Sequence, residues 1–171
     1  MKTIKVILVI ISLMVVAFLA TGFLIKETTY TVKVTINKPL NEVFTSFTNI
    51  DNSKNWMPEI QEIETINKNF GITGSTYKLK ILNQEQPIFV TERVMAYVPK
   101  EKYTVFMDAE NMLTKYDYLF SEENDKTTIE LNARRQSETY LMGCMFPFFK
   151  GNFITQDQLI LNNFKDFIEK D

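Results

Sequence analysis

The sequence feature that most constrains the fold is a succession of segments in which apolar and polar residues alternate, followed by one long helical segment. The clearest pair runs from Met112 to Phe120 and from Thr127 to Arg134, with a polar turn between them. Alternation with period two places successive side chains on opposite faces of a strand. The pattern therefore predicts a meander of antiparallel strands with one apolar, aromatic face and one mostly polar face.

Further alternating segments extend this sheet toward the N-terminus. They cover residues 28–36, 60–66, 77–82, 87–98 and 103–107. Between the first two, Pro39 suits the first turn of a helix, and the apolar residues from Leu40 to Phe47 recur at helical spacing. A second short helical segment is expected to carry Trp56 and to end near Pro58.

The closing segment, residues 139–171, predicts the major helix of the domain. Its second half has a regular apolar stripe, whereas residues 139–149 carry no charge and are rich in Met and Phe. Pro147 lacks a backbone donor, so we expect a break around residues 145–151. The aromatic cluster there would act as a lid over, or a plug inside, a hollow between helix and sheet.

The N-terminal segment directs the chain to a membrane. The run from Val6 to Ile25 holds no charge, and as a helix it would span about 30 Å, the thickness of a bilayer core. A cleaved signal peptide is the alternative, which would make the protein secreted, but the run is longer than a usual signal core. We expect a single-pass anchor in residues 1–27 and one domain in residues 28–171, with Lys2 and Lys5 favouring an exported C-terminal domain.

Charge and residue usage exclude several classes of function. The formal net charge is −2, which gives no electrostatic footprint for a nucleic-acid partner. There is no histidine, the commonest general base and zinc ligand, and the single cysteine, Cys144, cannot form an internal disulfide. We therefore expect no metal site, no cofactor and no catalytic residue. The carboxylates of Glu92, Asp108, Glu110 and Asp117 are available, but their spacing singles out no acid-base pair.

Three local patterns carry a resemblance to a known family. In residues 34–44 a strand ends in a polar-Pro turn and a helix begins with an acidic residue before Val-Phe; Trp56 precedes Pro58; and residues 116–120 and 126–131 form a strand pair with Thr127 after the turn. In this order they resemble the START-like helix-grip superfamily, also called SRPBCC or polyketide-cyclase-like. The resemblance implies an α+β fold in which an antiparallel sheet wraps around a long C-terminal helix. The aromatic residues 145–149 depart from the usual pattern and suggest a fuller or differently shaped hollow.

The resemblance also implies a groove between sheet and helix for apolar molecules such as lipids, sterols or polyketides. If the aromatic face points inward, ten residues are candidates for ligand contact, although each is also a candidate for plain core packing. They are Trp56, Tyr77, Phe89, Tyr103, Tyr116, Tyr118, Phe120, Met142, Met145 and Phe149. Of the arginines in the strands, Arg93, Arg134 and Arg135, each is expected to pair with an acidic residue on the solvated face rather than with a ligand.

Together these features predict a membrane-anchored, non-enzymatic domain that binds a hydrophobic or lipid-like small molecule. A cyclase- or aromatase-like enzyme and a ligandless interaction scaffold are the alternatives, since fold alone does not decide function. The sequence does not indicate an oligomeric state.

Overall fold

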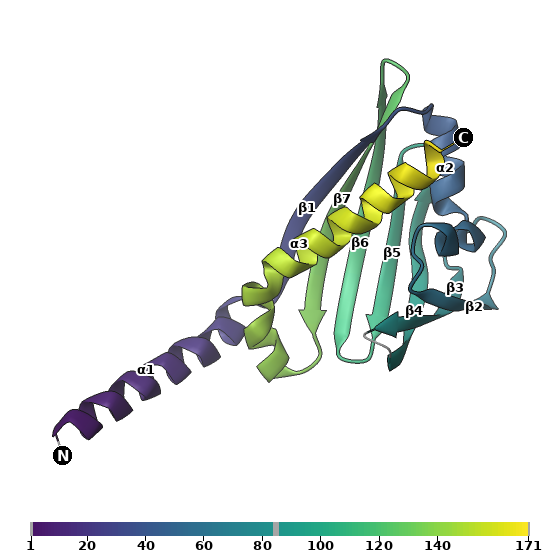
Figure 1. Ribbon diagram of the computed structural model, residues 1–171. Coiled ribbons are helices and arrows are strands. Elements are labelled where there is room, and N and C mark those ends of the chain that lie inside the picture. The colour runs from purple at the N-terminus through teal and green to yellow at the C-terminus, as the bar shows by residue number, and fades with distance from the viewer. Residues whose placement is uncertain (1, 84–85, 171) are drawn as a thin grey trace.

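The computed structural model describes residues 2–83 and 86–170. A long N-terminal helix, α1 (Lys2–Leu24), projects from a domain in which one sheet curves around a second long helix, α3 (Tyr140–Ile168). Figure 1 shows α3 lying diagonally across the concave face of the sheet, with α1 leaving from the end where α3 begins. This is the predicted helix-grip architecture.

The sheet is antiparallel throughout. Its strands are β1 (Thr28–Ile36), β2 (Ile60–Asn67), β3 (Thr76–Asn83), β4 (Gln86–Val98), β5 (Lys102–Ala109), β6 (Met112–Glu123) and β7 (Lys126–Ser137). Their order is β1-β7-β6-β5-β4-β3-β2, so β2 to β7 form a meander and β1 pairs with the last strand. The alternation of buried and exposed residues along β1 and β7 sets their register, because a slip by one residue would turn every apolar side chain to the solvent.

Two short helical elements, α2 (Leu40–Thr48) and η1 (Ile50–Asn55), close one end of the sheet. The buried hydroxyl of Thr127 donates a hydrogen bond of 2.8 Å to the carbonyl of Lys38, which fixes the turn before α2 against β7. Phe47 of α2 then packs on Trp56 and on Phe164 of α3, with ring centroids 5.3 and 4.9 Å apart. Pairs of this geometry contribute about 1 kcal/mol each beyond the area they bury.

Helix α3 is continuous, and the break predicted around residues 145–151 is wrong. Pro147 lies inside the helix, which costs one backbone hydrogen bond but leaves its fixed φ compatible with helical geometry. Figure 1 shows the helix changing direction between its first turns and the stretch that crosses the sheet. The first turns contact the end of α1, whereas Leu161, Phe164 and Ile168 are buried on the sheet. The proline therefore bends the helix without interrupting it.

Candidate functional site

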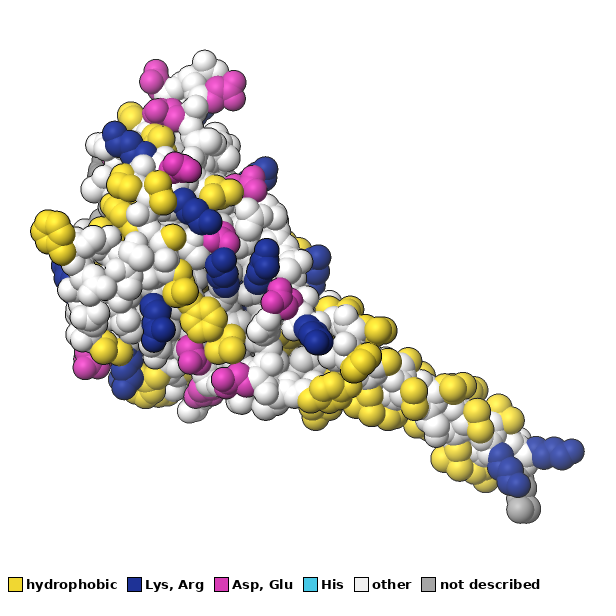
Figure 2. All heavy atoms as spheres, turned by 180° about the vertical axis from the view of Figure 1, so that it is seen from behind, with side chains coloured by type: hydrophobic (Ala, Val, Ile, Leu, Met, Phe, Trp, Pro, Cys, Tyr) yellow, Lys and Arg dark blue, Asp and Glu magenta, His cyan; other side chains and the backbone are white. Residues whose placement is uncertain are grey.

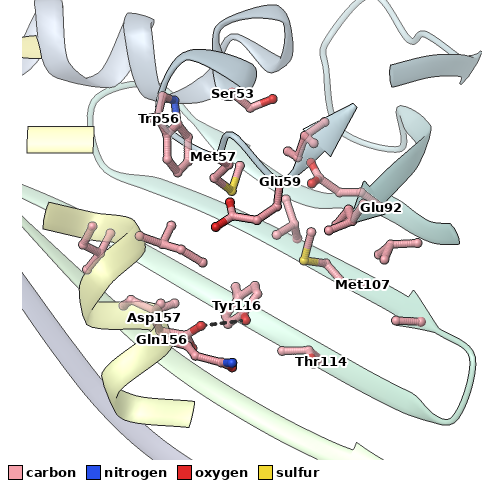
Figure 3. Close-up of a pocket in the computed structure, with 18 of the residues that line it drawn as sticks. Ser53, Trp56, Met57, Glu59, Glu92, Met107, Thr114, Tyr116, Gln156 and Asp157 are labelled. Atoms are coloured by element: carbon pink, nitrogen blue, oxygen red, sulfur yellow. Dashed lines mark hydrogen bonds between the residues drawn. The ribbon is translucent and has the colours of Figure 1, made fainter. Parts of the chain in front are cut away.

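A cavity of about 360 Å³ lies between α3 and the inner face of β4, β5 and β6. Most of its wall is apolar, and Figure 3 shows Trp56 and Met57 at the end formed by η1, with Met107 on β5 opposite the helix. Several polar side chains interrupt this apolar wall. They are Thr48, Ser53, Glu59, Glu92, Thr114, Arg135, Gln156, Asp157 and Asn163.

Four of the ten predicted contact residues line this cavity. Trp56, Tyr103, Tyr116 and Tyr118 are all buried and form part of its wall. Two more, Tyr77 and Phe120, are buried on the same face of the sheet but outside the lining.

Phe89 lies on the other side of the sheet. Val90 and Glu92 of β4 are buried, so the residue before them points outward, and 53% of the Phe89 surface is exposed. Its ring is covered by Lys78, whose Nζ lies 4.8 Å from the ring centroid. The expectation that Phe89 faces the hollow is therefore wrong. It assigned Phe89 to the same face of the sheet as the inward-pointing residues of the neighbouring strands.

The three predicted residues at the start of α3 do not reach the cavity either. Met142, Met145 and Phe149 are exposed, and none of them lines it. The aromatic cluster is thus neither a lid over this cavity nor a plug inside it. The helix side of the wall comes from the middle of α3, one to several turns further on. It consists of Gln156, Asp157, Leu159, Ile160, Leu161 and Asn163.

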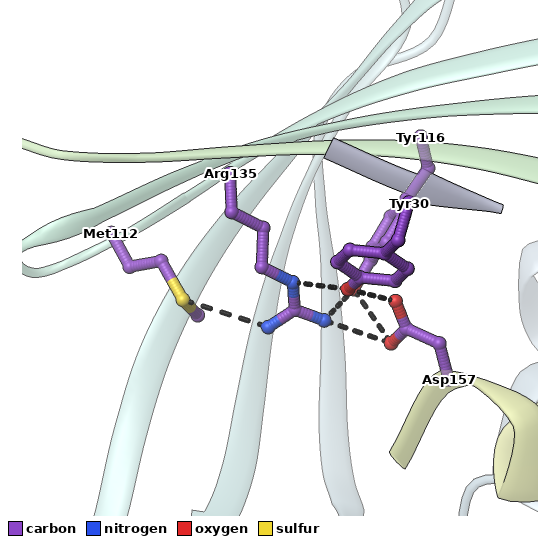
Figure 4. Close-up of polar contacts among 5 residues, drawn as sticks. All are labelled: Tyr30, Met112, Tyr116, Arg135 and Asp157. Carbon is purple, nitrogen blue, oxygen red and sulfur yellow. Dashed lines mark hydrogen bonds and ion pairs between the residues drawn. The ribbon is translucent and has the colours of Figure 1, made fainter. Parts of the chain in front are cut away.

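A buried ion pair joins α3 to the sheet beside the cavity. Arg135 of β7 donates from Nη2 to Asp157 Oδ1 over 2.8 Å, and both side chains are at least 95% buried. Two tyrosines complete the cluster: Tyr30 donates to Asp157 Oδ2 over 2.5 Å and Tyr116 donates to Oδ1 over 3.0 Å. Figure 4 shows the guanidinium also reaching both tyrosine oxygens and the sulfur of Met112.

The physical role of this cluster follows from its burial. An unpaired charge in such surroundings would be strongly destabilising, and here the carboxylate accepts three hydrogen bonds while the guanidinium stacks over Phe153, with Cζ 4.5 Å from the ring centroid. Burial and the neighbouring Asp157 charge raise the pKa of Tyr30 far above its usual range, so its phenol stays protonated and donates. The cluster is a rigid polar wall at one side of an apolar cavity.

Sequence reasoning missed this cluster. Arg135 was expected on the solvated face, yet it lies in phase with the buried Leu131 and Ala133, while Arg134 is exposed and 3.9 Å from Glu27. Asp157 was not singled out at all. The signal was its position in the apolar stripe of α3, where one acidic residue in a buried face requires a partner.

A second polar group in the wall is Glu92. Its carboxylate accepts a hydrogen bond from Tyr103 over 3.3 Å, and only 5% of the residue is exposed. Burial, opposed by that hydrogen bond, raises the pKa of Glu92 from 4.5 to about 7. Near neutral pH this carboxyl group is therefore divided between its neutral and its ionised form, and each form has a different hydrogen-bonding capacity.

Comparison of the sequence with protein-family models and with curated proteins finds no match. Comparison of the structure with solved structures finds the same fold in several proteins. A START superfamily protein from Mycobacterium smegmatis has a TM-score of 0.69 and 11% identity over 83% of this chain and 97% of its own. Ara h 8.0201 has a TM-score of 0.67 and 13% identity over 85% of this chain and 99% of its own.

A third similar structure is that of the di-domain ARO/CYC StfQ from the steffimycin biosynthetic pathway. It has a TM-score of 0.68 and 8% identity over 84% of this chain, which spans 51% of that longer protein. Identities this low establish a shared fold and leave activity and ligand to be argued from the site itself.

Proposed function

Since the chain has the START-like helix-grip fold, we propose that its domain binds an amphipathic, lipid-like small molecule in the cavity between the sheet and α3. The observation that carries the proposal is the composition of the cavity wall. An apolar cavity of about 360 Å³ with a few convergent polar groups is typical of a small-molecule site. The apolar wall would take the body of the ligand and exclude water from it.

The polar groups define the head group that this ligand would carry. Within residues 2–83 and 86–170, Glu92 accepts one side-chain hydrogen bond, from Tyr103, and its carboxylate has further acceptor capacity toward the cavity. A hydroxyl or amino group on the ligand would satisfy that capacity. The carboxylate of Asp157, by contrast, is already bonded to Arg135, Tyr30 and Tyr116, so we assign it to holding the wall in place.

We further propose that α1 anchors this domain in a membrane. The helix has 23 residues with a mean hydropathy of 2.8 in its most apolar window, and none of that window is buried in the protein. A helix of this composition, exposed except where its last turns contact α3, is long enough to cross a bilayer. The anchor would hold the cavity next to the source of lipid-like ligands and so raise their effective concentration.

Native mass spectrometry of the full chain, released from detergent, tests the binding proposal. We expect co-purified mass of an amphipathic molecule, or uptake of one from a lipid extract. Tyr118→Ala removes an aromatic ring from the cavity wall and should reduce that bound mass. Phe89→Ala, on the opposite face of the sheet, should leave it unchanged. A chain that carries and takes up nothing would refute ligand binding and would favour the scaffold alternative.

The second candidate is an enzyme with a cyclase- or aromatase-like activity, and Glu92 is the observation that favours it. A carboxyl group in an apolar cavity with a pKa of about 7 suits general acid-base catalysis at neutral pH. Once a bound molecule is identified, its conversion by the wild-type protein and not by Glu92→Gln would establish this alternative. Binding without any conversion would exclude it for that ligand.

A further inference from the structure

We infer that the first turns of α3, residues 140–149, form a second membrane-contacting element that lies in the same bilayer leaflet as the end of α1. This inference rests on the proposed anchoring by α1 and goes beyond it, because it assigns a surface of the folded domain to the lipid. We call this surface the α3 patch. It comprises the exposed side chains of Tyr140, Leu141, Met142, Met145, Phe148 and Phe149.

The α3 patch is unusually apolar for a surface facing water. Between 39% and 68% of each of its six side chains is exposed, and Phe148 is the most exposed of them. No charged residue occurs from Thr139 to Phe149, whereas Glu138 and Lys150 flank the segment on either side. Contiguous exposed apolar surface of this kind marks a contact with another apolar phase.

Contacts with α1 fix the depth of the α3 patch. The phenol of Tyr140 donates to the carbonyl of Leu19 over 2.5 Å, and the rings of Phe18 and Phe148 stack with centroids 6.2 Å apart. Along a helix, Leu19 lies about 10 Å before Lys26, the first charged residue after the span. If α1 crosses the bilayer, the groups that touch Leu19 and Phe18 lie below the level of the lipid head groups.

The junction between α1 and α3 is close-packed. These contacts, rather than the short linker after α1, fix the position of the α3 patch relative to α1. Thr21 donates to the carbonyl of Cys144 over 3.0 Å, and a Cβ atom at Gly22 would overlap the Sγ atom of Cys144. Only residues 25–27 separate α1 from β1. In Figure 2 the hydrophobic surface of α1 continues onto the adjoining part of the domain.

The bilayer is the occupant that these observations favour. The α3 patch is continuous with a helix whose composition suits a membrane, and an uncharged helical segment bearing Tyr, Met and Phe fits the boundary between head groups and acyl chains. The chain that leads into the patch passes close to one end of the cavity. The backbone N–H of Glu138 donates to the carbonyl of Asn111 over 3.1 Å, and the next residue, Met112, lines the cavity.

Spin labelling of the full chain in phosphatidylcholine vesicles tests this inference. In a Cys144→Ser background, a nitroxide is attached at Leu141→Cys or Phe148→Cys, and its collision rates with O₂ and with a water-soluble nickel chelate are measured. Asn162→Cys, exposed on the same helix, serves as the water-facing control, and Val15→Cys in α1 as the lipid-facing control. We expect the O₂-to-nickel ratio at both patch sites to exceed that at Asn162 and to approach that at Val15.

Three other outcomes would overturn the inference, each in a different way. A ratio at the patch sites equal to that at Asn162 would place the patch in water. Low collision rates with both reagents, together with spectral broadening that disappears on dilution with unlabelled chain, would show that a second copy covers it. A water-like ratio at Val15 itself would refute the membrane anchor as well, so the failure of the anchor is distinguishable from failure of the patch alone.

Discussion

Replacing Glu92 with glutamine is expected to remove a pH-dependent loss of stability in the ligand-free protein. Below about pH 4.5 the carboxyl group is neutral in both the folded and the unfolded chain, since the pKa is 4.5 when unfolded and about 7 when folded. Between these values the unfolded chain releases its proton while the folded chain keeps it, so stability falls as the pH rises. Above pH 7 the loss is complete, and the two pKa values correspond to about 3 kcal/mol.

Urea unfolding of the full chain in a non-ionic detergent, followed by near-UV circular dichroism, measures this effect. The stability difference between Glu92→Gln and the wild type should grow by about 2.5 kcal/mol from pH 5 to pH 8, in favour of the variant, which corresponds to about 8 °C in Tm. Glu64→Gln removes an exposed carboxylate from β2 and should not alter the pH dependence. Parallel pH profiles for wild type and Glu92→Gln would show that the carboxyl group is solvated in the folded protein and would refute the reasoning.

Two further substitutions probe the ion pair and the helix junction. Asp157→Asn leaves a buried arginine without its counter-ion and should lower the free energy of unfolding by about 3–5 kcal/mol. Asp166→Asn, at an exposed position of the same helix, should change the free energy of unfolding little. Equal effects of the two substitutions would contradict a buried ion pair. Gly22→Ala should displace the buried Cys144 thiol and so speed its reaction with a maleimide in the native chain. Gly151→Ala is the control, because a Cβ atom at Gly151 has no other atom within 4 Å, and it should leave the rate unchanged. An unchanged rate for Gly22→Ala would mean that the two helices do not pack as described.

The order and type of the elements were predictable from the sequence because local periodicity determines them. Alternation along residues 28–36 and 112–134 predicts a sheet with one buried face, and the structure confirms those strands. The error at Phe89 shows where this signal ends. An aromatic residue on a strand indicates a half-buried surface, but the choice between faces depends on phase, and Glu92 rather than Phe89 shares the phase of the core residues of β4.

The cavity and its polar groups were less predictable, because a cavity depends on which side chains fail to fill the space between two elements. Residues that pack a core and residues that line a cavity have the same periodicity, so alternation alone does not separate Tyr118, which reaches the cavity, from Phe120, which does not. The pairing of Arg135 with Asp157 joins positions on β7 and α3 that no local motif relates. Continuity through Pro147 likewise depends on the tertiary setting, in which the contact with α1 supports the first turns of the helix.

The strand order has a consequence for how the domain is made. Strand β1 follows α1 almost directly, yet among the described strands it pairs only with β7, with Thr28 opposite Arg135, and most of the domain lies between them in sequence. During synthesis β1 therefore emerges first, and its backbone donors and acceptors have no partner in the sheet until β7 has been synthesised. Until then, the unpaired strand can pair with strands of other chains. A chaperone that shields residues 28–36, or rapid delivery of the remaining chain, would set the yield of folded protein.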